Sequence, residues 1–292
     1  MADAEIDAVR AILASTPRPA GLAERRERLD ALGSRYPLPA DVLVDANGVA
    51  AEWTLTPEAE ASRVILFLHG GGYVSGSLDS HRHMVAQAGR EARARTLALG
   101  YRLAPEHPFP AALKDAIAGY RFLLSRGFDP KRIAVAGESA GGGLAIAMLV
   151  SLRDGGVSMP ACIWCSSPWV DLEAIAESMS AKATVDPLIQ KSYLMELATS
   201  YLNGADPRAP LASPIYADLG GLPPLLIQVG SAETLLDDAV RLAGIAGAAD
   251  MRVTLEVWPD MIHAWHLFYQ QLAPGRRALA QVGAFLVRIS HQ

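Results

Sequence analysis

The chain has 292 residues, of which 51% are hydrophobic, and a net charge of −5 with acidic and basic residues interspersed. This size predicts one large α/β domain or two small ones with a substantial core. Because no basic run carries interleaved aromatic residues, a nucleic-acid partner is not expected. The acidic N-terminus does not resemble a signal peptide, and no apolar run is long enough to span a membrane. We therefore expect a cytoplasmic protein that is not inserted into a membrane.

The N-terminal region predicts two amphipathic, charged helices, at 4–14 and 20–32. Their character differs from that of the following segments, so we expect them to pack over the core rather than form it. Two short strands are predicted next, at 42–44 and 50–55. They are joined at Asn47-Gly48, a pair typical of hairpin turns, which predicts an antiparallel start to the sheet.

From residue 64 onward, apolar strands alternate with helices joined by short loops. The predicted strands cover 64–68, 96–99, 133–136, 161–166, 225–229 and 253–257. The predicted helices cover 80–94, 111–125, 144–150, 237–249 and 275–290. Repeated βα units of this kind predict a mostly parallel, doubly wound sheet. A mostly helical insertion at 172–203 interrupts the alternation, and we expect it to join the N-terminal helices as a cap on one catalytic domain.

A candidate nucleophile, Ser139, lies in a Gly-x-Ser-x-Gly pattern between the strand 133–136 and the helix that follows it. A serine on such a turn sits on strained backbone, so Gly137 and Gly141 stand where a Cβ would collide. The side chain is then exposed at the carboxyl end of the strand, and the helix dipole favours developing negative charge there. An ordinary βα turn can carry the same pattern, but the flanking strand and helix favour a nucleophile.

A serine nucleophile needs a histidine base, which follows it in the chain in this type of fold. His263 lies in the loop between the last predicted strand and the last predicted helix, where it can fold back over Ser139. His266, three residues further on and within a predicted helical turn, is the alternative. We therefore assign the base to His263.

The acid that orients the histidine is expected after the strand 225–229, where three carboxylates compete. Glu233 comes first after the strand. Asp237 and Asp238 stand where a helix N-terminus favours acidic residues for capping and for its dipole. We assign the orienting role to Glu233, with Asp237 as the alternative.

The segment His69-Gly70-Gly71-Gly72 follows a buried strand and supplies backbone amides unobstructed by side chains. With the amide of Ala140, these groups suit an oxyanion hole. A phosphate-binding loop is the alternative, but the chain has neither a G-K-[ST] sequence nor a G-x-G-x-x-G with a downstream acid. The pattern therefore favours acyl transfer.

The two cysteines, Cys162 and Cys165, form a C-x-x-C pair within the predicted strand 161–166. A strand directs these two side chains to opposite faces, and the chain has no second pair of cysteine ligands. We therefore expect core thiols rather than a redox or metal site.

Four motifs in this order resemble the hormone-sensitive-lipase-like branch of the α/β hydrolases, a group of bacterial carboxylesterases. They are His69-Gly70-Gly71-Gly72, Tyr101-Arg102-Leu103-Ala104-Pro105-Glu106, Gly137-Glu138-Ser139-Ala140-Gly141 and Met261-Ile262-His263. The resemblance covers about 40–290. It implies an α/β-hydrolase fold, with a mostly parallel eight-stranded sheet flanked by helices, a helical cap, no cofactor and no metal. It also divides the chain into 1–45 (N-terminal part of the cap), 46–171 (first part of the core), 172–205 (cap insertion) and 206–292 (second part of the core).

The resemblance further implies Ser139 as nucleophile and His263 as base. It implies the amides of Gly71, Gly72 and Ala140 as the oxyanion hole, although which two of the three loop glycines donate is left open. The chain departs from the family pattern at two positions. Glu138 replaces an aspartate or threonine, and we expect its side chain to point away from the nucleophile and to have a structural effect. Glu233 stands where the family has an aspartate followed by Pro-Leu, and a glutamate can do the same job with one more methylene.

Together these features predict a serine carboxylester hydrolase that acts through an acyl-enzyme on a small-molecule ester. Its substrates are expected to be short or medium acyl esters or lactones. The predicted cap insertion contains Met179, Tyr193, Met195 and Tyr201, which suit either an apolar acyl site or the core of the cap. Two other functions are considered: an amidase or peptidase on the same triad, and a non-catalytic ligand-binding protein of the same fold. The resemblance is compatible with a homodimer.

Overall fold

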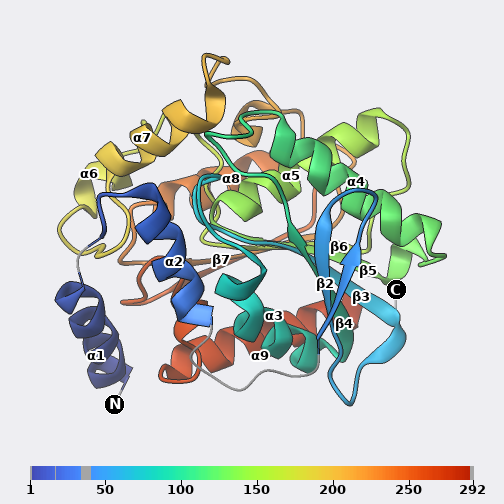
Figure 1. The fold of residues 1–292 in the computed structure, drawn as a ribbon, viewed down its shortest axis with the longest axis horizontal. Coiled ribbons are helices and arrows are strands. Elements are labelled where there is room, and N and C mark those ends of the chain that lie inside the picture. The colour runs from blue at the N-terminus through green and yellow to red at the C-terminus, as the bar shows by residue number, and fades with distance from the viewer. Residues whose placement is uncertain (1, 17, 34–40, 290–292) are drawn as a thin grey trace.

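The computed structural model describes residues 2–16, 18–33 and 41–289. In this part of the chain, an eight-stranded sheet has the order β1-β2-β4-β3-β5-β6-β7-β8, with helices on both faces (Figure 1). The strands are β1 (Asp41–Asp45), β2 (Ala50–Thr54), β3 (Glu60–Leu68), β4 (Ala94–Gly100), β5 (Ile133–Glu138), β6 (Cys162–Ser166), β7 (Leu225–Gly230) and β8 (Val253–Trp258). β2 is antiparallel to β1 and β4, and the remaining pairings are parallel. The predicted mostly parallel sheet flanked by helices is confirmed.

The helices of the described ranges lie mainly between consecutive strands. They are α1 (Ala2–Ser15), α2 (Leu22–Gly33), α3 (Leu78–Ala92), α4 (Ala111–Ser125), α5 (Ala140–Asp154), α6 (Ser178–Ala181), α7 (Lys191–Leu202), α8 (Leu236–Ala248) and α9 (Ala273–Ile289), with short 3₁₀ turns η1 (Pro130–Arg132), η2 (Pro214–Tyr216) and η3 (Trp265–Phe268). None of them is both long enough and apolar enough to cross a membrane.

The strand β3 explains how the core is divided into two layers. Its side chains alternate between the two faces of the sheet, as the pleat of a strand requires. Leu66 and Leu68 join the apolar cluster that also contains residues of α4, α5 and α8. Ile65 and Phe67 join the cluster that contains residues of α3 and α9. A strand buried on both faces therefore reads as the continuous apolar run seen in the sequence.

The helices α1, α2, α6 and α7, which we call the cap helices, lie along one side of the molecule (Figure 1). α2 is held to the core by Arg26, whose Nε donates to Val74 O at 2.9 Å and whose Nη2 donates to Ala104 O at 3.0 Å. Arg26 also forms a two-pronged ion pair with Glu106. The division of the chain into cap and core segments stays a prediction, but β1 already pairs with β2 before residue 46.

Two element starts differ from their predictions for identifiable reasons. This helix was predicted to begin at residue 80, whereas α3 begins at Leu78. Its N-cap is Ser77, whose hydroxyl accepts from Ser80 N while the Ser80 hydroxyl accepts from Ser77 N. This reciprocal capping box begins the helix two residues before Ser80. β3 begins at Glu60 rather than at residue 64, because its polar first residues pair at the end of the sheet although they lack an apolar pattern.

Candidate active site

Ser139 lies at the turn between β5 and α5, as the motif predicted. Its backbone has φ 53° and ψ −119°, a conformation that is strained for a residue with a side chain. The turn is fixed on both sides, because Ser139 N donates to Ser166 O at 2.9 Å and Ser139 O accepts from Trp169 N at 2.9 Å. A Cβ on Gly137 would lie 2.1 Å from Gly141 O, so the first glycine of the motif is required by the close approach of the helix.

The loop after β8 brings His263 to the nucleophile. His263 Nε2 lies 3.0 Å from Ser139 Oγ, and Nδ1 lies 2.7 Å from Glu233 Oε2. The loop packs against the segment after β7, where Ala232 N donates to Met261 O at 3.0 Å. Three side chains that are far apart in the sequence are therefore in one continuous line of contacts, and His263 is 4% exposed.

Glu233 is fully buried and is held by two donors on the oxygen that does not face the histidine. Its Oε1 accepts from Gly230 N at 2.5 Å and from Ser167 Oγ at 2.9 Å. Burial disfavours a charged imidazole, but the hydrogen bond and the charge of Glu233 outweigh it and raise the pKa of His263 above its ordinary value. The pair is thus arranged to hold a proton on the histidine.

The competing residues hold other parts of the structure. Asp237 Oδ2 accepts from Ser178 N at 2.8 Å, at the start of α6. Asp238 Oδ2 accepts from two amides, those of Val170 and Asp171. Both residues lie in the first turn of α8, but α8 has no side-chain cap, so they bond to other segments and the predicted capping role was wrong. Glu233 is left as the carboxylate on Nδ1 of the histidine.

His266, the alternative base, is bound to other side chains. Its Nδ1 lies 2.7 Å from Ser166 Oγ and its Nε2 lies 2.9 Å from Gln228 Oε1. Burial lowers the pKa of His266 to about 3, so the ring is neutral. It packs beneath the site instead of facing the nucleophile.

The glycine loop after β3 has a backbone conformation that only glycine suits. Gly71 has φ 110°, and a Cβ there would lie 2.2 Å from Ser75 O, so no other residue fits. Gly71 O accepts from Val74 N and Ser75 N, which fixes the loop. Within the described ranges, the amides of Gly71, Gly72 and Ala140 donate to no protein acceptor. Such unpaired amides beside a nucleophile suit an oxyanion.

His69 and Tyr101 support this loop from below. Their rings are stacked, with centroids 4.1 Å apart, and Tyr101 Oη donates to His69 O at 2.6 Å. Burial lowers the pKa of His69 to about 3, which keeps its ring neutral. The first two motifs of the resemblance are therefore in contact.

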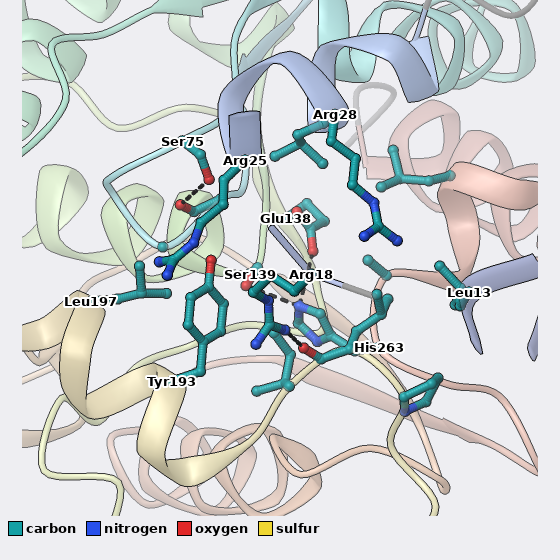
Figure 2. A pocket seen from close by; sticks show the side chains of 18 of the residues that line it. Leu13, Arg18, Arg25, Arg28, Ser75, Glu138, Ser139, Tyr193, Leu197 and His263 are labelled. Carbon is teal, nitrogen blue, oxygen red and sulfur yellow. Dashed lines mark hydrogen bonds and ion pairs between the residues drawn. The ribbon is translucent and has the colours of Figure 1, made fainter. Parts of the chain in front are cut away.

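A cavity of about 210 Å³ lies over Ser139 and His263. The cap helices and the segments next to them contribute much of its wall, as Figure 2 shows for Leu13, Arg18, Arg25, Arg28, Tyr193 and Leu197. The Arg18 guanidinium lies 3.5 Å from the centre of the Tyr193 ring. Of the Met and Tyr residues considered for an acyl site, Met179 and Tyr201 are buried elsewhere in the core, and Tyr193 reaches the cavity.

Glu138 departs from its prediction. It was expected to point away from the nucleophile, as in a regular strand. In the structure, Glu138 Oε1 lies 3.4 Å from His263 Nε2. Figure 2 shows Glu138 and Ser139 both directed at the His263 imidazole. The cause is the turn itself, because the positive φ of Ser139 interrupts the strand geometry immediately after Glu138.

Ser167, which donates to Glu233, was not predicted either. The signal available in the sequence is its position just after β6, at the same edge of the sheet as the nucleophile turn.

The structure also accounts for the cysteines, since burial raises the pKa of both Cys162 and Cys165 to about 12. They are core thiols, and the described residues contain no cluster of three or more His, Cys, Asp or Glu side chains suited to a metal.

Comparisons with known proteins agree with this fold. Residues 65–267 match the model of a family described as having the alpha/beta hydrolase fold. An acetyl-hydrolase of Streptomyces hygroscopicus is 48% identical over 257 residues, which cover 88% of this chain and 85% of that protein. An esterase of Acinetobacter venetianus is 34% identical over 239 residues, covering 82% and 78% of the two chains.

Solved structures give the same result. A crystal structure described as an esterase from the bacterial hormone-sensitive lipase family is 48% identical, with a TM-score of 0.95 and 98% of each chain covered. The structure of EstE5 soaked with p-nitrophenyl butyrate is 43% identical, with a TM-score of 0.94 and 99% of each chain covered. The chain therefore belongs to the α/β-hydrolase family, in the branch of the bacterial hormone-sensitive-lipase-like esterases.

Proposed function

We propose that this protein is a serine carboxylester hydrolase that forms a covalent acyl-enzyme on Ser139. The observation that carries the proposal is the line of contacts from Ser139 Oγ through the His263 ring to Glu233, with distances of 3.0 Å and 2.7 Å. The relatives described as acetyl-hydrolase and esterase support the same chemistry.

In the first half of the reaction, His263 Nε2 takes the proton of Ser139 as Oγ attacks the ester carbonyl carbon. The carbonyl oxygen becomes an oxyanion, for which the amides of Gly71, Gly72 and Ala140 are the proposed donors. Glu233 holds the imidazolium in orientation from Nδ1. The imidazolium then gives its proton to the departing alcohol, and the C–O bond of the ester breaks.

In the second half, water replaces the alcohol. His263 accepts a proton from the water, whose oxygen attacks the acyl carbon. The tetrahedral intermediate collapses with return of the proton to Ser139 Oγ, and the carboxylic acid leaves. No cofactor or metal is needed for these steps.

The proposed substrates are esters with short or medium acyl chains, or lactones. A cavity of about 210 Å³ has room for a small acyl group, and its wall includes Leu13, Ile189 and Leu194 beside Trp169. The neighbour soaked with a butyrate ester supports the short end of this range. An acyl-length series of p-nitrophenyl esters tests the range, with kcat/KM expected to peak at short chains.

Turnover of p-nitrophenyl butyrate and of the matching p-nitroanilide, compared in the wild type and in Ser139→Ala, tests the function itself. We expect ester hydrolysis that is lost in the variant and little hydrolysis of the anilide. Comparable anilide turnover would favour an amidase, whereas no activity on either compound would favour a ligand-binding protein. The cytoplasmic location and the homodimer stay predictions, to be tested by cell fractionation and by light scattering.

A further inference from the structure

Glu138 is a buried carboxylate beside the proposed catalytic histidine, and the triad chemistry gives it no role. It is the last residue of β5, and it is 3% exposed. Its Oε1 has no hydrogen-bond partner in the described ranges and lies 3.4 Å from His263 Nε2. A buried carboxylate oxygen without a partner is costly, so its position next to the nitrogen that exchanges the proton calls for an explanation.

The other oxygen of Glu138 is held by His81. Glu138 Oε2 lies 3.1 Å from His81 Nε2. On the other side of the His81 ring, Nδ1 lies 2.7 Å from Ser80 Oγ. The ring is therefore fixed between the start of α3 and Glu138, while Oε1 of Glu138 faces His263.

The glycine loop leaves room for this carboxylate. A Cβ on Gly70 would lie 1.7 Å from Glu138 Oε2, so the carboxylate occupies space that any larger residue would fill. The Gly70 amide also lies 3.3 Å from His81 Nε2. The position of Glu138 is thus fixed between the loop, α3 and His263.

The contact with His263 favours only one protonation state of the ring. While the ring is neutral, Nε2 presents a lone pair and accepts from Ser139. Once Nε2 has taken the serine proton, the imidazolium is attracted to Oε1, and the transition state that develops this charge is stabilised. At 3.4 Å the interaction is longer than an ordinary N–H···O bond, so charge rather than a strong hydrogen bond carries it.

We propose that Glu138 is a second carboxylate of the catalytic centre, which stabilises the His263 imidazolium from the Nε2 side while His81 holds it in place. This proposal rests on the proposed function of His263 as the base. It gives Glu138 the same task on one side of the ring that Glu233 has on the other.

Other titratable and charged groups also surround His263. Asp186, from the segment before α7, adds to the carboxylate field, and the neutral His266 lies below. The guanidinium groups of Arg18, Arg25 and Arg28 line the same cavity and oppose a positive charge on the ring. Burial lowers the pKa of His263, and Glu233, Glu138 and Asp186 raise it.

The variant Glu138→Gln tests the proposal. Two measurements report the protonation of His263 in it: an NMR titration of the ring, and the pH profile of kcat/KM on a neutral ester. The amide keeps the shape and removes the charge. We expect the His263 pKa, and with it the acidic limb of the profile, to fall by roughly one unit. The rate at high pH is expected to fall about tenfold. The matched control is Glu52→Gln, at a buried glutamate of β2 that is paired with Arg82. It should leave the His263 pKa and the rate at high pH unchanged.

Glu138→Asp provides a second variant if the glutamine does not fold. It keeps the charge but draws the carboxylate back from Nε2, so the pKa is expected to fall by less. An unchanged His263 pKa in both variants, with kcat/KM lowered equally at every pH, would show a purely structural role and overturn the proposal. The NMR titration does not depend on turnover, so an inactive wild type would count against the proposed function alone.

Discussion

Glu233 and Asp237 offer the sharpest contrast between neighbouring side chains. Glu233 contacts His263 at 2.7 Å, whereas Asp237 accepts from Ser178 N. Glu233→Gln loses the charge that holds the imidazolium and presents an amide to Nδ1, so we expect kcat to fall by on the order of 10⁴. Steady-state hydrolysis of a p-nitrophenyl ester measures this, and Asp237→Asn is the control, expected to stay near the wild-type rate. A damaging Asp237→Asn with a mild Glu233→Gln would reassign the acid.

The protonation of His263 predicts a pH dependence. Its pKa is raised to about 9, and only the neutral ring can accept the serine proton. kcat/KM is therefore expected to rise with pH and to reach half of its plateau near pH 9. Initial rates on a neutral ester between about pH 6 and 10 check this. An acidic limb at or below the ordinary histidine value of about 6.5 would contradict it.

Single residues differ in how far sequence could place them. Ser139 and His263 stand out because the turn motif and the loop position are local patterns. The orientation of Glu138 was predicted wrongly, since it depends on the φ of the following residue and on His81 from another element. Ser167 was missed because its contact with Glu233 crosses from one loop to another.

The loop after β3 carries a prediction of its own. In Gly71→Ala the new Cβ meets Ser75 O, and the φ of 110° becomes unfavourable. The loop must therefore shift, and its amides no longer point at the oxyanion. Loss of one oxyanion donor costs roughly 10²–10³ in kcat. Gly127→Ala is the control, because it also has a positive φ of 82° but nothing within 4 Å of the new Cβ. Equal kcat in the two variants would argue against the loop as the oxyanion site.

At the start of α8, Asp238 anchors the helix to the segment after β6. Burial raises its pKa to about 7, against about 3.9 in an unfolded chain. Folding therefore favours the protonated form, and the stability that this group contributes is full below about pH 4 and is lost as pH rises to about 7. Asp238→Asn removes this dependence. Urea unfolding at pH 5 and pH 8 should show a smaller loss of stability in the variant, and an equal loss in both proteins would contradict the assignment.

Among the elements, those with a continuous apolar run were predicted best. Every predicted strand and helix of the βα units is present, because burial on both faces of the sheet leaves a strong pattern. Element starts that depend on polar contacts were less accurate. The first residues of β3 are partly exposed, and the N-cap of α3 depends on a reciprocal pair of serines.

At the level of the complete chain, the sheet order explains why distant residues meet. Ser139, Glu233 and His263 follow β5, β7 and β8, which are parallel strands whose carboxyl ends lie at one edge. The alternation of strands and helices predicted the parallel sheet. The contacts of the cap helices with the core could not be predicted, because they depend on pairs such as Arg26 with Val74 O that connect separate segments.

The central claim is that Ser139 is the serine activated by this arrangement. Labelling with a sulfonyl fluoride, followed by peptide mapping by mass spectrometry, tests it most directly, since an activated serine reacts much faster than an ordinary one. We predict one label per chain on Ser139, loss of esterase activity in proportion to labelling, and no label on that peptide in Ser139→Ala. Activity lost through a label on another residue, or full activity in Ser139→Ala, would contradict the claim.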